Sequence, residues 1–322
     1  MLPSAAHPER GRFVRDQVAA LRALDGVDVE LHEFAPGPRA LVRAARELAQ
    51  RFGWTTALAR GRRLARFDIV HAHFGLTVWP ALAIPTRVRA LTVHGTDVRQ
   101  PRTRLATAAA LPLVDLLAAV SASLVAELPC RSSRRRAHVL PCGVDIERFR
   151  QLPRARARAE LGLDPDQPYA LFAADPARPE KRHDRALALA QATGARLLTL
   201  GGVDPERVPL WINAANAVLV PSEREGFGLA VLEALACDVP VLATPVGIHG
   251  EALASVRGAL CAPFELARWQ AALEAHLREA DPRVEGRASA SRFSARAMAV
   301  RVADAWREAL TRSRRTQSSP AG

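Results

Sequence analysis

Residues 217–236 read Ala217-Val-Leu-Val-Pro-Ser-Glu-Arg-Glu225-Gly-Phe-Gly228-Leu-Ala-Val-Leu-Glu233-Ala-Leu-Ala236, an apolar strand that passes through a glycine-containing turn into a helix. This arrangement is typical of phosphate sites, because glycines let a ligand approach the backbone and the N–H groups at a helix start attract anions. Glu225 lies at the mouth of the helix and Glu233 about a turn inside it. Acceptors at these two depths suit a ligand with hydroxyl groups at both ends and phosphates between them. A nucleotide-sugar is such a ligand.

The simpler interpretation of this stretch is an ordinary strand–helix unit in which both glutamates are solvated. It would suffice for an isolated pair of glutamates. It does not explain why Gly226-Phe-Gly228 separates the strand from the helix, or why the helix leads into Ala234-Leu-Ala-Cys-Asp-Val-Pro-Val-Leu-Ala-Thr-Pro245. We therefore favour a ligand site.

Apolar segments alternate with helical ones along the whole chain. Strands are predicted at 27–34, 68–74, 90–95, 116–121 and 137–143, and again at 169–174, 196–200, 217–220, 239–244 and 259–262. Helices are predicted at 13–24, 39–66, 153–161 and 294–311. Near-continuous apolar strands separated by helices predict parallel sheets covered on both faces, and 322 residues suffice for two such domains.

The beginning of the chain departs from this scheme. A doubly wound domain normally opens with a buried strand that carries the first ligand loop. Residues 1–14 are instead typical of the loop after that strand, and the helix 13–24 follows at once. We expect the first sheet to lack its first strand, or to have that place filled by another segment. Neither a signal peptide nor an apolar run long enough to span a membrane is expected.

The net charge of +12 is concentrated in the first half, where residues 1–150 hold 23 arginines and 13 acidic residues. The arginines are densest in the stretches 39–66 and 131–136. A basic amphipathic helix can lie on an anionic membrane surface, but a solvated helix face is nearly as good an interpretation. No nucleic-acid partner is expected, because no known nucleic-acid motif accompanies the charge and aromatic residues make up only 5%.

Two rare residue types carry further information. Lys181 is the single lysine among 45 basic residues, and its compact ammonium suits a phosphate. The four cysteines have neither disulfide-framework nor metal-ligand spacing, which predicts reduced thiols in a cytoplasmic protein; they are Cys130, Cys142, Cys237 and Cys261.

The segment Glu225-Gly-Phe-Gly-Leu-Ala-Val-Leu-Glu233-Ala-Leu-Ala resembles the E-x7-E signature of the retaining glycosyltransferases of family 4. These are two-domain GT-B enzymes with two Rossmann-like doubly wound α/β domains that face a cleft, and they use nucleotide-sugar donors without a bound metal. The resemblance covers about residues 7–310. It implies an acceptor-side domain at 1–148, a donor-binding domain at 149–293, and a final segment 294–322, in which a helix returns to the first domain before a disordered tail from Arg314.

The same resemblance implies roles for individual residues. Glu225 would hold donor-sugar hydroxyls, Glu233 would hold the ribose, and Lys181 would neutralise the pyrophosphate. His94, in Thr92-Val-His-Gly-Thr-Asp97, would face the sugar from the first domain, although a strand-end histidine bonded to backbone is the alternative interpretation. The remaining donor-binding positions are Gly226, Phe227, Gly228, Leu229, Arg178 and Gly11.

Several positions depart from the family pattern. Ala174-Asp175 stands where the family has Gly-Arg, so Arg178 is the candidate for the missing cation. Asn216 replaces an aspartate and Asp238 replaces a glycine. No metal is expected: His71 and His73 share a strand face but lack acidic partners, and Asp164-Pro-Asp166 is a DxD segment in a turn, where Asp and Pro are ordinary.

The expected protein is a metal-independent retaining glycosyltransferase of hexosyl type, without a cofactor beyond the nucleotide-sugar itself. Its acceptor would be a cell-envelope glycan or glycolipid, which places it in the cytoplasm at the inner face of the membrane. The alternatives are a non-catalytic or truncated GT-B-like protein that binds anionic surfaces, and a nucleotide-sugar epimerase. A phosphorylase would need a pyridoxal-binding lysine, and Lys181 is already assigned.

Overall fold

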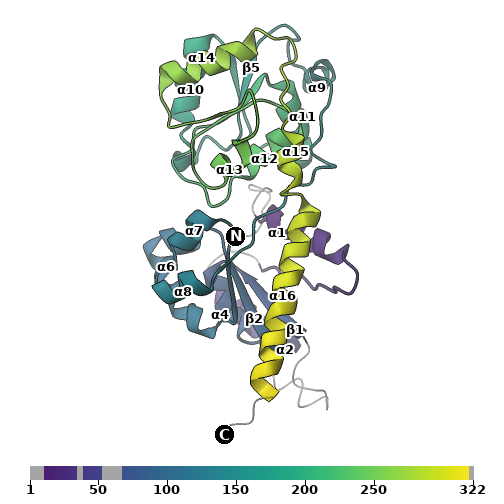
Figure 1. Cartoon of the computed structure of the whole chain (residues 1–322), viewed down its shortest axis with the longest axis vertical. Coiled ribbons are helices and arrows are strands. Elements are labelled where there is room, and N and C mark those ends of the chain that lie inside the picture. The colour runs from purple at the N-terminus through teal and green to yellow at the C-terminus, as the bar shows by residue number, and fades with distance from the viewer. Residues whose placement is uncertain (1–10, 35–38, 53–66, 319–322) are drawn as a thin grey trace. The chain divides into compact units, whose positions relative to one another are not determined.

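The computed structural model describes residues 11–34, 39–52 and 67–318, and these residues form two compact units (Figure 1). The first unit comprises residues 17–141 together with the segment from residue 298 onward. The second comprises residues 11–16 together with 142–297. Each unit is built on a parallel sheet with helices on its faces, so the predicted α/β class is confirmed.

The first sheet contains four parallel strands in the order in which they occur in the chain. They are β1 (Phe67–His73), β2 (Thr86–Val93), β3 (Leu116–Ala119) and β4 (His138–Val139). In the register of the first pair, His71 lies opposite Ala90 and His73 lies opposite Thr92. All of β3 and most of β2 are buried, as the apolar runs predict for strands covered on both faces.

Helices and short 3-10 turns connect these strands. They are α1 (Arg12–Arg22), α2 (Ala40–Phe52), η1 (Gly75–Thr77), α4 (Val78–Ala81), α5 (Thr96–Arg99), α6 (Pro101–Ala110), η2 (Leu111–Leu113), α7 (Ala122–Ala126) and α8 (Arg131–Arg136). Leu48 and Phe52 of α2 pack with Ile84 and Val70. The predicted helix 39–66 is thus present as α2, and its remainder, 53–66, lies outside the described residues.

The predicted strand 27–34 is wrong. These residues belong to no strand, although Val27 and Val29 pack against the core and the Arg22 side chain donates a hydrogen bond to the Val29 carbonyl at 2.9 Å. A strand needs a neighbour that takes up its backbone hydrogen bonds. Among the described strands, β1 lies at the sheet edge and pairs only with β2, so the half-buried apolar side chains of 27–34 pack without a ladder.

The long helix α16 (Ala295–Ser318) covers one face of the first sheet (Figure 1). Its buried side chains include Met298, Val302 and Ala309, and they pack with Val88 and Ala90 of the sheet. The sequence predicted disorder from Arg314, but the helix continues to Ser318. Arginine and glutamine favour helix, which accounts for the extension.

The second sheet has the strand order β6-β5-β7-β8-β9, and all its strands are parallel. They are β5 (Tyr169–Phe172), β6 (Arg196–Thr199), β7 (Ala217–Val220), β8 (Val241–Ala243) and β9 (Leu260–Cys261). The order reverses between β5 and β7, so the loops at the carboxyl ends of these two strands leave toward opposite faces. Such a reversal opens a crevice that α/β proteins use for ligands.

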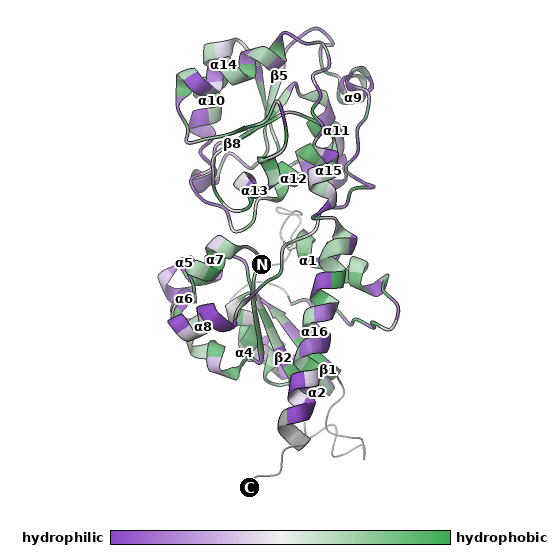
Figure 2. Ribbon diagram, in the orientation of Figure 1, coloured by the Kyte–Doolittle hydropathy of each residue, from purple (hydrophilic) through white to green (hydrophobic). Residues whose placement is uncertain are grey.

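The elements around this sheet are α9 (Arg154–Leu161), η3 (Pro179–Lys181), α10 (His183–Thr193), η4 (Pro205–Arg207), α11 (Val208–Ala214), α12 (Leu229–Ala236), α13 (His249–Leu253), α14 (Leu266–Leu277) and α15 (Arg287–Ser291). Figure 2 shows α12 as mostly apolar along its length, and five of its eight residues are buried. A helix that is apolar nearly all round is held rigidly inside its unit, so its N-terminus is a fixed point.

Candidate active site

The loops after β5 and β7 bring Lys181 and Glu225 together. Lys181 Nζ lies 2.6 Å from Glu225 Oε1 and 2.7 Å from Oε2, and only 14% and 9% of the two side chains are exposed. Ser222 Oγ donates a further hydrogen bond to Glu225 Oε1 at 2.8 Å. The sequence predicted both residues as site residues, but it did not predict that they contact each other.

Electrostatics keep Glu225 ionised. Burial by itself would raise the pKa of Glu225, but the Lys181 ammonium and the hydrogen bonds from Lys181 and Ser222 outweigh burial and hold the pKa below its ordinary value. The group is therefore a carboxylate at neutral pH. A buried cation and a buried anion in contact can each exchange partner for a ligand group of the right charge.

The turn between Glu225 and α12 packs tightly against the segment that follows β8. Gly228 has φ 117°, and a Cβ atom there would lie 2.4 Å from His249 Nε2. Gly247 has φ 60°, and its Cβ would lie 2.1 Å from the Phe227 carbonyl oxygen. The Ile248 N–H donates to that same oxygen at 2.9 Å. The loop after β8 thus fixes the backbone of the predicted residues Gly226, Phe227 and Gly228, which precede Leu229.

Sequence reasoning missed His249. Its ring is fully buried, its Nδ1 lies 2.9 Å from the Thr244 carbonyl oxygen, and burial lowers its pKa. The available signal was the Gly247-Ile-His249-Gly250 segment directly after a strand, at the same sheet edge as Glu225.

Glu233 lies on α12 with a half-buried side chain. Burial raises the pKa of its carboxyl group to about 7, against the opposing effect of Arg148. Within the described part of the chain, no side chain or backbone N–H donates a hydrogen bond to this carboxylate. It can therefore take hydroxyl donors from a ligand.

Arg178 is not brought to the Lys181–Glu225 pair. Its side chain is 56% exposed, and its Nε and Nη2 donate to Glu180 Oε1 at 3.0 and 2.7 Å. The loop itself is closed by backbone bonds from Lys181 N to Arg178 O at 3.0 Å and from Glu223 N to Glu180 O at 3.0 Å. The second bond joins the two site loops to each other.

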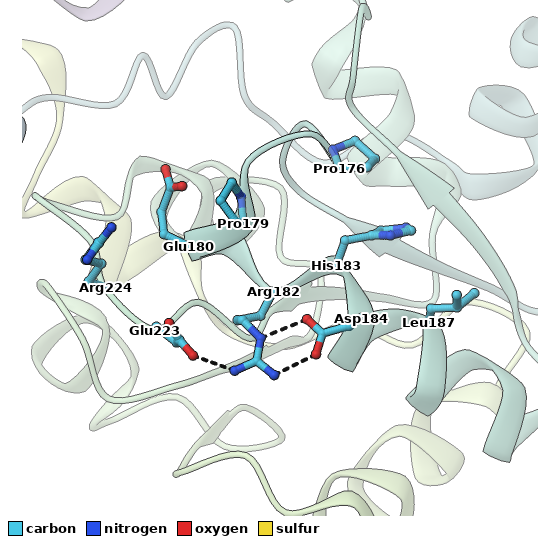
Figure 3. Close-up of a pocket in the computed structure, with 9 residues that line it drawn as sticks. All are labelled: Pro176, Pro179, Glu180, Arg182, His183, Asp184, Leu187, Glu223 and Arg224. Carbon is cyan, nitrogen blue, oxygen red and sulfur yellow. Dashed lines mark hydrogen bonds and ion pairs between the residues drawn. The ribbon is translucent and has the colours of Figure 1, made fainter.

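A shallow pocket of about 640 Å³ opens beside these loops (Figure 3). Arg182 crosses its floor and donates to both carboxylate oxygens of Asp184 at 2.8 and 2.6 Å, and it also pairs with Glu223. Because Asp184 and Glu223 together outweigh the single charge of Arg182, this group is net negative and does not favour a phosphate. The pairing of Arg182 with Asp184 and Glu223 links the two loops that carry Lys181 and Glu225.

The other predicted catalytic residue, His94, belongs to the first unit, at the end of β2. Its backbone N–H and that of Gly95 donate to the buried Asp97 carboxylate at 3.1 and 2.8 Å. The Gly75 N–H, after β1, donates to the same carboxylate at 3.3 Å. Asp97 thereby ties the two strand ends together. Asp97 had no predicted role, although its position three residues after a strand-end histidine was a usable signal in the sequence.

Gly11 begins α1 with φ 72° and is buried, and its carbonyl accepts the N–H groups of Val14 and Arg15. Among the described residues, no group of three or more His, Cys, Asp or Glu side chains is arranged so that it could hold a metal ion. Asp164 accepts the Asp166 N–H at 2.9 Å within a turn. All four cysteines are free thiols. None of the helices in the described ranges is long and apolar enough to cross a bilayer.

Comparison with known proteins agrees with this geometry. Residues 11–148 match the family described as Glycosyltransferase Family 4, and residues 165–292 match Glycosyl transferases group 1. The D-inositol 3-phosphate glycosyltransferase of Segniliparus rotundus is 30% identical, over 88% of this chain and 76% of the relative. The protein of the same name from Thermobispora bispora is 28% identical, over 78% of this chain and 73% of the relative.

Solved structures show the same architecture. Sucrose-phosphate synthase from Thermosynechococcus elongatus superposes with a TM-score of 0.65 at 22% identity, over 92% of both chains. Anabaena HepE, solved with UDP and glucose, has a TM-score of 0.66 at 16% identity, over 94% of this chain and 97% of that chain. The chain belongs to glycosyltransferase family 4, and its two parallel-sheet units are the two Rossmann-like domains of the GT-B fold.

Proposed function

We propose that this glycosyltransferase moves a hexosyl group from a nucleoside-diphosphate sugar to an acceptor with retention of configuration. The observation that carries the proposal is the Lys181–Glu225 pair, buried at the carboxyl ends of β5 and β7 and next to the start of α12. An ammonium for phosphate oxygens and a carboxylate for sugar hydroxyls lie side by side where the fold places ligands. HepE, solved with UDP-glucose, supports a donor of this class.

In the proposed complex, the donor gives each member of the pair a new partner. Diphosphate oxygens accept hydrogen bonds from Lys181, and sugar hydroxyls donate to Glu225. Glu233, whose carboxylate lies about a turn inside α12, takes the ribose hydroxyls. The backbone from Gly226 to Leu229 lines the sugar and phosphates, and Gly11 and His94 contribute from the start of α1 and the end of β2.

Transfer breaks the bond between the anomeric carbon and the diphosphate oxygen, so negative charge develops on the leaving group. Lys181 stabilises this charge more in the transition state than in the ground state, which accelerates the step. The acceptor oxygen forms the new bond on the same face of the sugar, and its proton passes to the leaving phosphate. In this scheme the protein supplies no nucleophile and the reaction uses no metal ion.

Binding of UDP, GDP and ADP, measured by titration calorimetry, tests the donor site. One nucleotide should bind to the wild type, and both Lys181→Ala and Glu233→Ala should weaken it at least about tenfold. Arg156→Ala is the matched control, because Arg156 is exposed and, among the residues that the structure describes, pairs only with its helix neighbour Glu160. Unchanged affinity in both site variants would sink the assignment.

Turnover distinguishes the chemistry. Release of the nucleoside diphosphate from UDP-, GDP- or ADP-sugars, with formation of a glycoside of unchanged anomeric configuration and no loss of rate in EDTA, is expected. An inverted product or a requirement for metal would contradict the proposed mechanism. Conversion of the donor sugar without nucleotide release would indicate an epimerase.

We further propose that the acceptor is a cell-envelope glycan or glycolipid and that the first unit meets it at an anionic membrane surface. Arg43 and Arg46 are exposed on α2. On α8, however, Arg134 and Arg136 donate to backbone carbonyls of Leu128, Val114 and Leu111, so their charges serve the fold. Co-sedimentation with phosphatidylglycerol vesicles at low salt, lost in Arg43→Ala/Arg46→Ala, is expected. Equal sedimentation with neutral vesicles would refute this part.

A further inference from the structure

Three histidines at the carboxyl ends of β1 and β2 are in mutual contact. His71 and His73 project from the same face of β1, and their rings stack with centroids 4.8 Å apart and planes 17° apart. His73 Nδ1 lies 3.0 Å from His94 Nε2. From the sequence, His71 and His73 have only a structural role, yet His73 bonds directly to the ring of the proposed catalytic histidine.

At the end of this cluster away from His94, hydrogen bonds to Trp306 and Thr92 fix the tautomer of His71. Trp306, on α16, donates its indole N–H to His71 Nδ1 at 3.1 Å, and an indole can only donate. His71 Nδ1 is therefore an acceptor. The proton of the neutral ring must sit on Nε2, which lies 2.8 Å from Thr92 Oγ1 and donates to it. Both nitrogens of His71 are thus used, and its ring plane is set.

The near end of the cluster holds His94 from several sides. Its backbone is fixed by Asp97, its ring lies against Phe74 with centroids 4.9 Å apart, and its Nε2 is bonded to His73. Burial lowers the pKa of all three histidines, so the rings are neutral at pH 7. The hydrogen bond between the two neutral rings holds one proton, so the tautomers of His73 and His94 are coupled.

We propose that His73 is a positioning residue for His94: the bond between His73 Nδ1 and His94 Nε2 selects one ring orientation and one tautomer of His94, and the stacked His71, locked by Trp306, holds His73 in place. The inference rests on the role proposed above for His94 at the donor sugar. It explains why polar rings, rather than the aliphatic side chains usual for buried strands, occupy these two positions. An imidazole can flip about its χ2 axis between two similar shapes, and the bond to His73 distinguishes these two orientations of His94.

Asparagine and leucine at position 73 separate bonding from packing. The asparagine side chain places its terminal amide near the position of Nδ1, so His73→Asn can keep the bond to His94. His73→Leu fills similar space without a polar atom. The wild type and both variants are labelled with ring-¹⁵N histidine, and proton–nitrogen correlation spectra assign each tautomer, with His94→Gln identifying the His94 signals.

A single His94 tautomer is expected in the wild type and in His73→Asn, and two tautomers in exchange are expected in His73→Leu. In turnover of the nucleotide sugar that the wild type uses, His73→Leu should lower kcat about tenfold or more with donor KM unchanged, and His73→Asn should restore most of it. A merely structural role would change the melting temperature of both variants without changing tautomers.

A single, unchanged His94 tautomer in His73→Leu would overturn the proposal, and so would two tautomers in the wild type. If His73→Leu does not fold, Trp306→Phe serves as the second variant, because it removes the donor to His71 and should release the His71 tautomer in the same spectra. The spectra do not depend on turnover. Absence of turnover in the wild type would therefore count against the proposed function alone, whereas the tautomers decide the positioning role.

Discussion

The ring of His249 fills the space that a side chain at Gly228 would need, since a Cβ atom there would lie 2.4 Å from Nε2 and 2.6 Å from Cδ2. The two residues come from different loops, after β7 and after β8. The glycine turn at the start of α12 is therefore held in one shape by a neighbouring loop, and the N–H groups that face a donor are ordered before it binds.

Gly228→Ala should destabilise the protein and abolish donor binding. The left-handed backbone at φ 117° costs a non-glycine residue about 1–2 kcal/mol, and displacement of a fully buried ring adds to it. The matched control is Gly250→Ala, because Gly250 lies in α13 without a positive φ and its Cβ would meet nothing within 4 Å. Thermal and urea unfolding should separate the two variants. Equal melting temperatures would contradict the packing described here.

Removal of one member of the Lys181–Glu225 pair should be more harmful than removal of both charges. Lys181→Met leaves a buried carboxylate without its counter-ion and should cost about 3–5 kcal/mol of unfolding free energy. Lys181→Met/Glu225→Gln leaves two neutral side chains of similar size, and we expect it to recover much of that loss while donor binding stays absent. Urea denaturation of the single and double variants measures the coupling. Strictly additive losses would show that the two charges do not interact.

The carboxyl group of Glu233 should make nucleotide binding depend on pH near neutrality. Burial raises its pKa in the folded protein to about 7, above its ordinary value of 4.5. Between these two pH values, Glu233 therefore holds a proton in the folded state that it has lost in the unfolded state. The contribution of the protonated Glu233 carboxyl group to the free energy of unfolding is full below about pH 4.5 and disappears as the pH rises through 7.

Ribose hydroxyls, in contrast, bind best to the carboxylate, so nucleotide affinity should rise between pH 6 and about 8. Glu233→Gln should flatten both trends, which calorimetry and melting curves across pH can follow. The same pH dependence in Glu233→Gln would assign the titration to the phosphates of the ligand or to another group.

Asp238 should tolerate asparagine but not glycine, even though it has a positive φ of 55°. Its Oδ1 accepts the N–H groups of Gly286 and Arg287 at 2.9 and 2.8 Å and so caps the start of α15. Asp238→Gly relieves the backbone but loses both bonds, and we expect a net loss of about 1 kcal/mol. Asp238→Asn keeps an oxygen in place and should melt within a few degrees of the wild type. A more stable glycine variant would show that backbone strain outweighs the cap.

The parallel sheets could be predicted from sequence because buried strands carry continuous apolar runs. Leu116–Ala119 and Ala217–Val220 lie inside their predicted ranges for that reason. The segment 27–34, Val-Asp-Val-Glu-Leu-His-Glu-Phe, instead alternates apolar with polar residues as a half-buried strand would, but it forms no strand. Apolar patterning reports which side chains are buried, whereas a strand also needs a neighbouring backbone, and sequence patterning does not show whether one is present.

The departures from the family pattern also find physical reasons in the structure. Asn216 accepts bonds from Tyr169 N and Arg158 Nη2 through its oxygen and donates to the carbonyls of His276 and Glu279 through its nitrogen. An aspartate could make only the accepting bonds. Asp238 replaces a glycine because its side chain caps α15. Neither reason can be read from a motif, since the partners lie 47 or more residues away in all of these bonds.

Some site residues are marked by the sequence and others are not. Glu225, Glu233 and Lys181 could be named because a linear motif and a unique lysine mark them. The contact between Lys181 and Glu225 spans 44 residues of sequence, and the pairing of Arg178 with Glu180 depends on a local loop conformation. His249, Asp97 and His73 act through neighbours, so no motif at the ligand identifies them.

Helix α16 has a consequence for how the protein is made. Its residues from Met298 onward belong to the core of the first unit, alongside Val88 and Ala90. The strands of the second unit, from Tyr169 to Cys261, come from one uninterrupted stretch that is synthesised earlier than α16. The first unit therefore waits for α16, which leaves the ribosome only after every strand of the second unit. Nascent chains usually acquire structure from the N-terminus onward, but here the later-encoded unit can be completed first.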